Sequence, residues 1–143
     1  MRQFEIYIDG ASKGNPGHAG IGVIICQDGQ VLRNISSYIG KATNNVAEYT
    51  ALIYALQEAL VLKAESVNIN TDSQLLYRQM RRDYKVRHPL IFSLYTQARH
   101  LASAFKGFNI KQIPREDNRG ADKLATRAVK QALKKTAPVG YLI

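Results

Sequence analysis

Three strand-like stretches come first in this chain, before any helical pattern appears. Apolar and polar side chains alternate over residues 4–9, and this period of two predicts a half-buried strand that ends at Asp9. Residues 21–26 and 31–39 predict two further strands. Asp28-Gly29 between them indicates a two-residue hairpin, because both turn positions need a positive φ. We therefore expect the fold to open with three antiparallel strands.

Helical and strand-like patterns alternate through the remaining residues. Thr43 or Asn44 can cap a long helix that runs to about Leu62, where apolar side chains follow helical spacing. The later patterns predict a strand at 67–69, helices at 73–80 and 89–105, a strand at 108–113 and a final helix at 118–135. The order βββαβααβα predicts an α/β fold, a mixed five-stranded sheet with helices packed on it. We expect residues 1–143 to form one domain.

The chain is strongly basic, with 20 Lys and Arg against 11 Asp and Glu and a formal net charge of +9. This balance favours a nucleic-acid partner, although an anionic membrane surface or a ribosomal neighbour would also explain it. One Cys excludes an internal disulfide. The absence of a leader pattern and of a long apolar run predicts a cytoplasmic protein.

Acidic residues are scarce, and four of them stand where a structural role alone is hard to assign: Asp9, Glu48, Asp72 and Asp122. Asp9 could initiate a turn, Asp72 could cap the helix that begins at Ser73, and Asp122 could be a first-turn acid that the helix dipole favours. Glu48 is harder to explain, because it lies on the helical line that faces the core. A carboxylate there costs free energy unless it is paired or bound to a metal.

Topology connects these four carboxylates. Two are expected at the carboxyl ends of strands and two in the first turns of helices beside those strands, which is the edge where open α/β sheets bind ligands. Carboxylates that repel one another need a cation between them, and hard divalent cations prefer oxygen ligands. The pattern predicts a magnesium or manganese site that faces a polyanion.

Four sequence blocks carry a resemblance to a known family: DGASKGNPG with a following GIG, TNNVAEYTAL, TDSQLL and ADKLA. In this order, at these spacings and on these elements, they resemble the type 1 ribonuclease H family over nearly the whole chain. The resemblance implies a ribonuclease H-like fold and a metal-dependent endonuclease. It would hydrolyse the RNA strand of RNA/DNA hybrids and leave 5′-phosphate and 3′-hydroxyl ends.

The resemblance also implies roles for the four carboxylates. Asp9, Glu48, Asp72 and Asp122 match the family's acidic tetrad, which holds two Mg²⁺ ions, with Mn²⁺ able to substitute. Asp9 would bridge both ions, Glu48 would hold one ion near the RNA strand, and Asp72 would complete the coordination. Asp122 would close the site only when substrate is present. Two cations roughly 3.5 to 4 Å apart acidify the attacking water and neutralise the leaving oxygen.

Neighbouring polar residues resemble the family's substrate contacts. Ser12 and Asn15 in the stretch 12–17, with Asn44 and Asn45, match contacts to the minor groove, where amides can meet 2′-hydroxyls without choosing a sequence. The remaining matches are Gln74, beside the third carboxylate, and Thr43, a phosphate contact on the DNA strand. Helix capping is the alternative role for the two adjacent asparagines.

A basic cluster follows the second predicted helix and contains a single acid, Asp83. Its cations are Arg78, Arg81, Arg82, Lys85 and Arg87, joined by His88. The cluster predicts a patch that binds duplex phosphates, and its alternative is a solvated helix face. The longer basic protrusion of some family members is missing here. Lys130, Lys134 and Lys135 predict a second basic patch.

One departure from the family concerns proton transfer. Many members carry a histidine in the loop before the last carboxylate, but residues 114–121 contain none. Glu116, Asp117 or water could substitute, with a lower rate.

The leading alternative is a non-catalytic module that binds RNA/DNA hybrid or RNA on the same fold. A P-loop is excluded because the Gly-Lys-Ser/Thr ending is missing. We expect a monomer with no obligate protein partner and no membrane contact.

Overall fold

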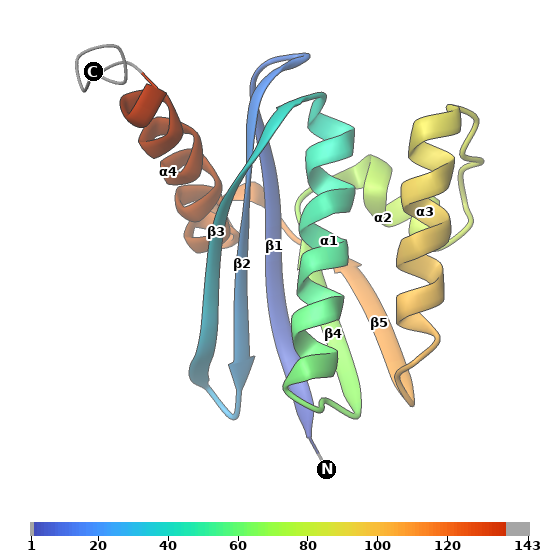
Figure 1. Ribbon diagram of the computed structural model, residues 1–143. Helices are drawn as coiled ribbons and strands as arrows, with labels where there is room; N and C mark the ends of the chain where they lie inside the picture. The colour runs from blue at the N-terminus through green and yellow to red at the C-terminus, as the bar shows by residue number, and fades with distance from the viewer. Residues whose placement is uncertain (1, 137–143) are drawn as a thin grey trace.

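The computed structural model describes residues 2–136, in which helices cover both faces of a five-stranded sheet (Figure 1). In chain order the elements are β1 (Gln3–Gly14), β2 (Gly17–Gln27), β3 (Gln30–Ala42), α1 (Asn44–Val61), β4 (Ser66–Thr71), α2 (Gln74–Met80), α3 (Pro89–Ala102), β5 (Gly107–Gln112), a 3₁₀ turn (Arg115–Asp117) and α4 (Arg119–Thr136). The predicted order βββαβααβα is confirmed. No helix among the described residues is long and apolar enough to cross a membrane.

The sheet has the strand order β3-β2-β1-β4-β5. Strands β1, β2 and β3 pair antiparallel, while β4 pairs parallel with both β1 and β5. Asp28 and Gly29, at φ values of 52° and 78°, form the predicted hairpin turn. The expected mixed sheet, with three antiparallel strands at its start, is therefore confirmed.

The expectation that the first strand ends at Asp9 is wrong. Strand β1 continues to Gly14, and Asp9 pairs with Gly22 in the middle of the strand. The glycine-rich segment stays extended because β2, which begins at Gly17, pairs with it along its whole length. Asp9 therefore starts no turn, and backbone pairing overrides the local preference of Asp and Gly.

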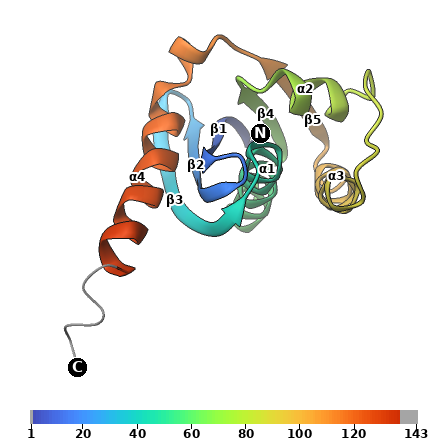
Figure 2. The same ribbon diagram turned by 90° about the horizontal axis from the view of Figure 1, so that it is seen from above.

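The two faces of the sheet carry different helices. Helix α1 packs on β1 with α3 beside it, while α4 lies on the opposite face over β2 and β3 (Figure 2). The core between α1 and the sheet is apolar and includes Ile6, Ile8 and Leu52. Helix α4 can approach the sheet closely because Gly22 has no side chain. A Cβ at this position would lie 2.0 Å from the Ala121 carbonyl oxygen. Helix α4 thus begins near the middle of β1, where Gly22 pairs with Asp9.

Candidate active site

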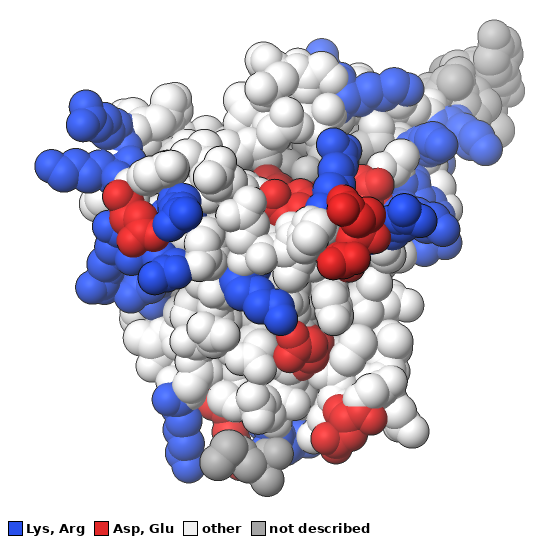
Figure 3. All heavy atoms as spheres, turned by 180° about the vertical axis from the view of Figure 1, so that it is seen from behind, with Lys and Arg blue, Asp and Glu red and all other residues white. Residues whose placement is uncertain are grey.

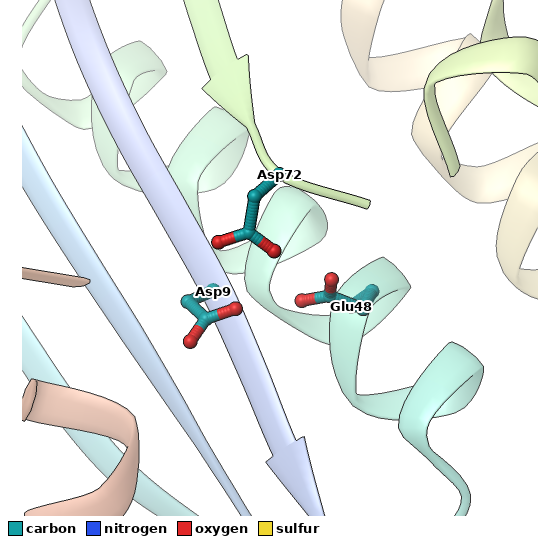
Figure 4. A group of neighbouring side chains, drawn as sticks. All are labelled: Asp9, Glu48 and Asp72. Carbon is teal, nitrogen blue, oxygen red and sulfur yellow. The ribbon is translucent and has the colours of Figure 1, made fainter. Parts of the chain in front are cut away.

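Three carboxylates from separate parts of the chain meet beside β1 (Figure 4). Asp9 extends from the middle of β1, Glu48 from the second turn of α1, and Asp72 from the residue directly after β4. One oxygen from each lies within 4.8 Å of the others. Asp9 and Glu48 are only 6% and 7% exposed. The predicted gathering of these three acids is confirmed.

Gly10 brings α1 close enough to the strand for this meeting. A Cβ on Gly10 would lie 2.3 Å from the carbonyl carbon of Ala47, a separation that no side chain tolerates. The Gly10 N–H also donates a hydrogen bond to Glu48 Oε1. Glycine is required here because helix backbone and strand backbone are in direct contact.

Asp72 is free to enter the cluster because it does not cap α2. The cap is Ser73, whose Oγ accepts a hydrogen bond from the Leu76 N–H at 3.1 Å. The Asp72 carboxylate is instead held by Asn118 Nδ2, which donates to Asp72 Oδ2 at 3.1 Å and to the Ile8 carbonyl at 2.8 Å. The capping alternative for Asp72 is therefore wrong.

Asp122 lies in the first turn of α4, as expected, and lines the same cavity as the other three acids. This cavity has a volume of 330 Å³, and Arg115 also lines it. The Asp122 oxygens lie outside the group within 4.8 Å, although Asp122 is near enough to raise the pKa of Asp9. The structure thus places a close triad and a fourth acid at one site.

The crowding of these acids changes their protonation. The pKa of Asp9 is raised from 3.8 to about 8 by burial first, then by the charge of Asp72 and by hydrogen bonding with Asp122, while Arg115 opposes the change. Burial, with the charges of Asp9 and Asp72, also raises the pKa of Glu48 well above its usual value. A bound cation would remove the repulsion that keeps protons on this cluster.

The donor set fits a hard divalent metal ion. In an octahedral Mg²⁺ site with bonds of about 2.1 Å, ligand oxygens lie about 3.0 Å apart when adjacent and about 4.2 Å apart when opposite. The triad oxygens, within 4.8 Å of one another, would reach these separations through small side-chain rotations. Asp9, Glu48 and Asp72 would hold such an ion, and Asp122 borders the same space.

Four of the uncharged residues predicted to contact substrate form hydrogen bonds within the protein. Ser12, Asn15 and Asn44 form a network in which Asn44 Oδ1 accepts from the Ser12 N–H at 3.1 Å and the Asn44 N–H donates to Asn15 Oδ1 at 3.0 Å. Thr43 caps α1 through its hydroxyl, which accepts from the Val46 N–H at 3.2 Å. The capping alternative for the asparagines is therefore wrong.

Asn45 differs from this network, because its Oδ1 is buried and accepts no hydrogen bond from the described residues. A buried acceptor without a donor is costly and often marks a site for an absent partner. Gln74 is exposed in the first turn of α2. Gln74 is thus at the surface, while Asn45 is only partly exposed.

The basic cluster does not form a helix face, because only Arg78 lies within α2 and the other four cations occupy the connection to α3. The helix-face alternative is therefore wrong for those four. Arg78 is half-buried and donates to Asp83 Oδ2 at 3.1 Å. Lys85 and Arg87 are exposed, and His88 caps α3.

The predicted second patch lies on α4, where Lys130, Lys134 and Lys135 are exposed. Figure 3 shows Lys and Arg gathered on both flanks of a central acidic group.

Two site residues were missed by sequence reasoning, Arg115 and Asn118. Both lie in the segment before Asp122, where many members of the family carry a histidine. Arg115 lines the acidic cavity, whereas Glu116 and Asp117 do not. Asn118 is only 1% exposed and its Oδ1 has no hydrogen-bond partner among the described residues. An asparagine just before the final helix was the available signal.

We expect Asn118→Ala to lower the affinity for Mg²⁺ by roughly 10- to 100-fold, the usual effect of losing a residue that orients a metal ligand. The reason is that Asp72 loses the donor that fixes its carboxylate. Isothermal titration with Mg²⁺ would measure this effect. Unchanged affinity would show that Asp72 is oriented without Asn118.

Comparison with known proteins agrees with this geometry. A family profile described as "Reverse transcriptase-like" matches residues 7–128. The chain is 42% identical over 134 residues to the bifunctional protein Rv2228c of Mycobacterium tuberculosis, covering 92% of this chain and 37% of that protein. It is 39% identical over 127 residues to ribonuclease HI of Halobacterium salinarum, covering 88% of this chain and 64% of that enzyme.

A solved structure extends the comparison to three dimensions. LC11-RNase H1, crystallised in complex with an RNA/DNA hybrid, superposes with a TM-score of 0.87 at 40% identity, covering 91% of this chain and 99% of that one. A mixed sheet with clustered acids beside its central strand defines the ribonuclease H-like class. This chain belongs to the type 1 ribonuclease H family. It spans less than two thirds of the length of the two relatives.

Proposed function

We propose that this chain is a metal-dependent endonuclease that hydrolyses the RNA strand of RNA/DNA hybrids and leaves 5′-phosphate and 3′-hydroxyl ends. The observation that carries the proposal is the triad of carboxylates within 4.8 Å of one another, two of them buried, on a protein of net charge +9. Such a cluster is costly to a fold unless it binds cations. A relative of 40% identity has been crystallised with an RNA/DNA hybrid, which supports the choice of substrate.

Asp9, Glu48, Asp72 and Asp122 would hold two Mg²⁺ ions, with Mn²⁺ able to substitute. When bound, the ions would supply an acidified water as nucleophile and neutralise the charge on the leaving 3′-oxygen. Asp9 is best placed to be shared, because both Asp72 and Asp122 interact with it. Glu48 is held rigid by the Gly10 N–H.

The surrounding residues would position the hybrid. Ser12, Asn15 and Asn44 hold the β1–β2 hairpin to the start of α1, which shapes a polar surface beside the acids. Thr43, Asn45 and Gln74 would contact the strands there. The proposed phosphate contacts are Arg78, Arg81, Arg82, Lys85 and Arg87. Amide groups suit a hybrid because they read 2′-hydroxyls without selecting bases.

Asn45→Ala should reduce the preference for ribose over deoxyribose in the cleaved strand by roughly tenfold, because each lost hydrogen bond to a polar ligand group costs about 1 to 1.5 kcal/mol. Competition between hybrid and double-stranded DNA would measure it. An unchanged preference would show that other residues recognise the 2′-hydroxyl groups.

A direct assay tests the whole proposal. Labelled RNA/DNA hybrid, double-stranded RNA and double-stranded DNA are offered with Mg²⁺, Mn²⁺ or a chelator. We expect cleavage of the hybrid RNA strand only when a metal is present. Hybrid that is bound but left intact would overturn the proposal and support a non-catalytic binding module.

A further inference from the structure

A second cavity, lined by different residues from the acidic one, lies at the edge of the sheet. It has a volume of 620 Å³ and lies between the end of α2, helix α3 and the edge strand β5. This is the flank formed by α2, α3 and β5, on the left of Figure 3, where Lys and Arg side chains gather. Two of its lining residues, Arg81 and Arg82, are proposed above as contacts to duplex phosphates, but Arg99 and Lys111 have no role in the proposed function.

Four cations line this cavity: Arg81 and Arg82 from the connection after α2, Arg99 from α3 and Lys111 from β5. The described residues that line it include no Asp or Glu. Arg99 is held in place, because its Nη1 donates to the Met80 carbonyl at the end of α2 at 3.0 Å. Folding thus places Arg99 and Lys111 beside Arg81 and Arg82 of the basic cluster. The result is a concave, positively charged site that can bind anions.

Arg82 has a conformation that favours glycine. It directly follows the Arg81 cap of α2 and has a φ of 67°, which is unfavourable for a residue with a side chain. Lys63 has the matching position after α1, with a φ of 63°, but it does not line the cavity. Both residues therefore occupy the left-handed position that commonly ends a helix, and of the two only Arg82 lines the cavity.

The shape of the cavity favours one kind of anion. A duplex is a convex rod and can contact only the rim of a pocket of this size, whereas one nucleotide can enter it. Tyr77 and Phe108 also line the cavity, and aromatic side chains with Arg are the usual platforms for unpaired bases. Single-stranded nucleic acid therefore fits better than duplex, and better than an acidic peptide, which has no bases to stack.

The cavity is also close to the catalytic cluster. Lys111 pairs with Asn70, two residues before Asp72. Neighbouring strands lie about 4.8 Å apart and rise about 3.3 Å per residue, so the Cα atoms of Lys111 and Asp72 are separated by roughly 8 Å.

We propose that this cavity binds the phosphates of an unpaired strand that continues from the hybrid in the catalytic site. This inference rests on the proposed function for the identity of the hybrid.

Binding of a fluorescent ten-nucleotide DNA strand, measured by anisotropy in chelator, tests the inference without any cleavage. We expect Arg82→Gly and Lys111→Gln each to weaken binding by roughly tenfold, the effect of losing one charge-assisted contact. Lys63→Gly should bind like the wild type. It is a matched control, because it removes the same charge and relieves the same backbone strain. Both glycine variants should melt at or above the wild-type temperature.

Two results would overturn the inference: equal affinity of all three variants for the DNA strand, or polyglutamate bound as tightly as DNA and weakened by the same substitutions. Cleavage of blunt hybrid by the wild type is measured separately with Mg²⁺. Cleavage together with unaltered DNA binding by Arg82→Gly would reject this cavity and keep the proposed function. Weakened binding by both cavity variants without any hybrid cleavage would reject the proposed function and keep the cavity as a single-strand site.

Discussion

Asp72→Asn should abolish cleavage of RNA/DNA hybrid while leaving the fold intact. The amide keeps the shape of the side chain and can still accept the hydrogen bond from Asn118, but it removes a charged oxygen ligand from the triad. We expect the rate with Mg²⁺ to fall by a factor on the order of 10³, the upper end of the usual loss for one preorganised electrostatic group. Single-turnover cleavage of labelled hybrid would measure it.

Asp28→Asn is the matched control for this loss. It makes the same chemical change in the exposed hairpin turn, where asparagine tolerates the observed φ of 52°. Its rate should equal that of the wild type, and circular dichroism should show both variants folded. Cleavage retained by Asp72→Asn would remove Asp72 from the mechanism and leave the metal site without one of its three close ligands.

The metal-free protein should lose stability as pH rises from about 4 to about 8. The pKa of Asp9 is about 8 in the folded protein and about 3.9 in an unfolded chain. Between these values the folded state binds more protons than the unfolded state, so the free energy of unfolding falls as pH increases. The raised pKa of Glu48 acts in the same direction. Thermal melts in chelator across this range would measure the change.

Asp9→Asn should remove much of this pH dependence and raise the melting temperature of the metal-free protein at pH 8 by about 5 °C. The reason is that a buried charge no longer faces Asp72 and Asp122. Mg²⁺ should stabilise the wild type more at pH 8 than at pH 6, because the ligands must lose protons to bind it. A melting temperature independent of pH in chelator would contradict the crowding of charges seen here.

Local patterns in the sequence predicted most of the fold correctly. The hairpin at Asp28-Gly29 followed from the φ that its turn requires, and Thr43, which caps α1, was one of the two caps that side-chain chemistry predicted. Alternation and helical spacing located the elements to within a few residues, except around β1 and β2. There the pairing of a glycine-rich segment across the hairpin depends on the partner strand, which no local pattern reports.

The candidate site was predictable in composition but not in arrangement. Glu48 was identified from its position on a buried helical line, since a carboxylate there needs a partner. The roles of Gly10 and Asn118 were not accessible, because each depends on contacts with residues far along the chain. The cavity formed by Arg82, Arg99 and Lys111 was hidden for the same reason.

By itself, the sequence determined the order of the elements, the excess of positive charge and the identity of the acids. These properties depend on residue types and on spacing over a few positions. Only the tertiary structure decided that Asp9 lies within a strand, that Asp122 lies apart from the close triad, and that a basic cavity forms separately from the acidic one. Distances between side chains depend on how the helices pack against the sheet, and that packing is a property of the whole chain.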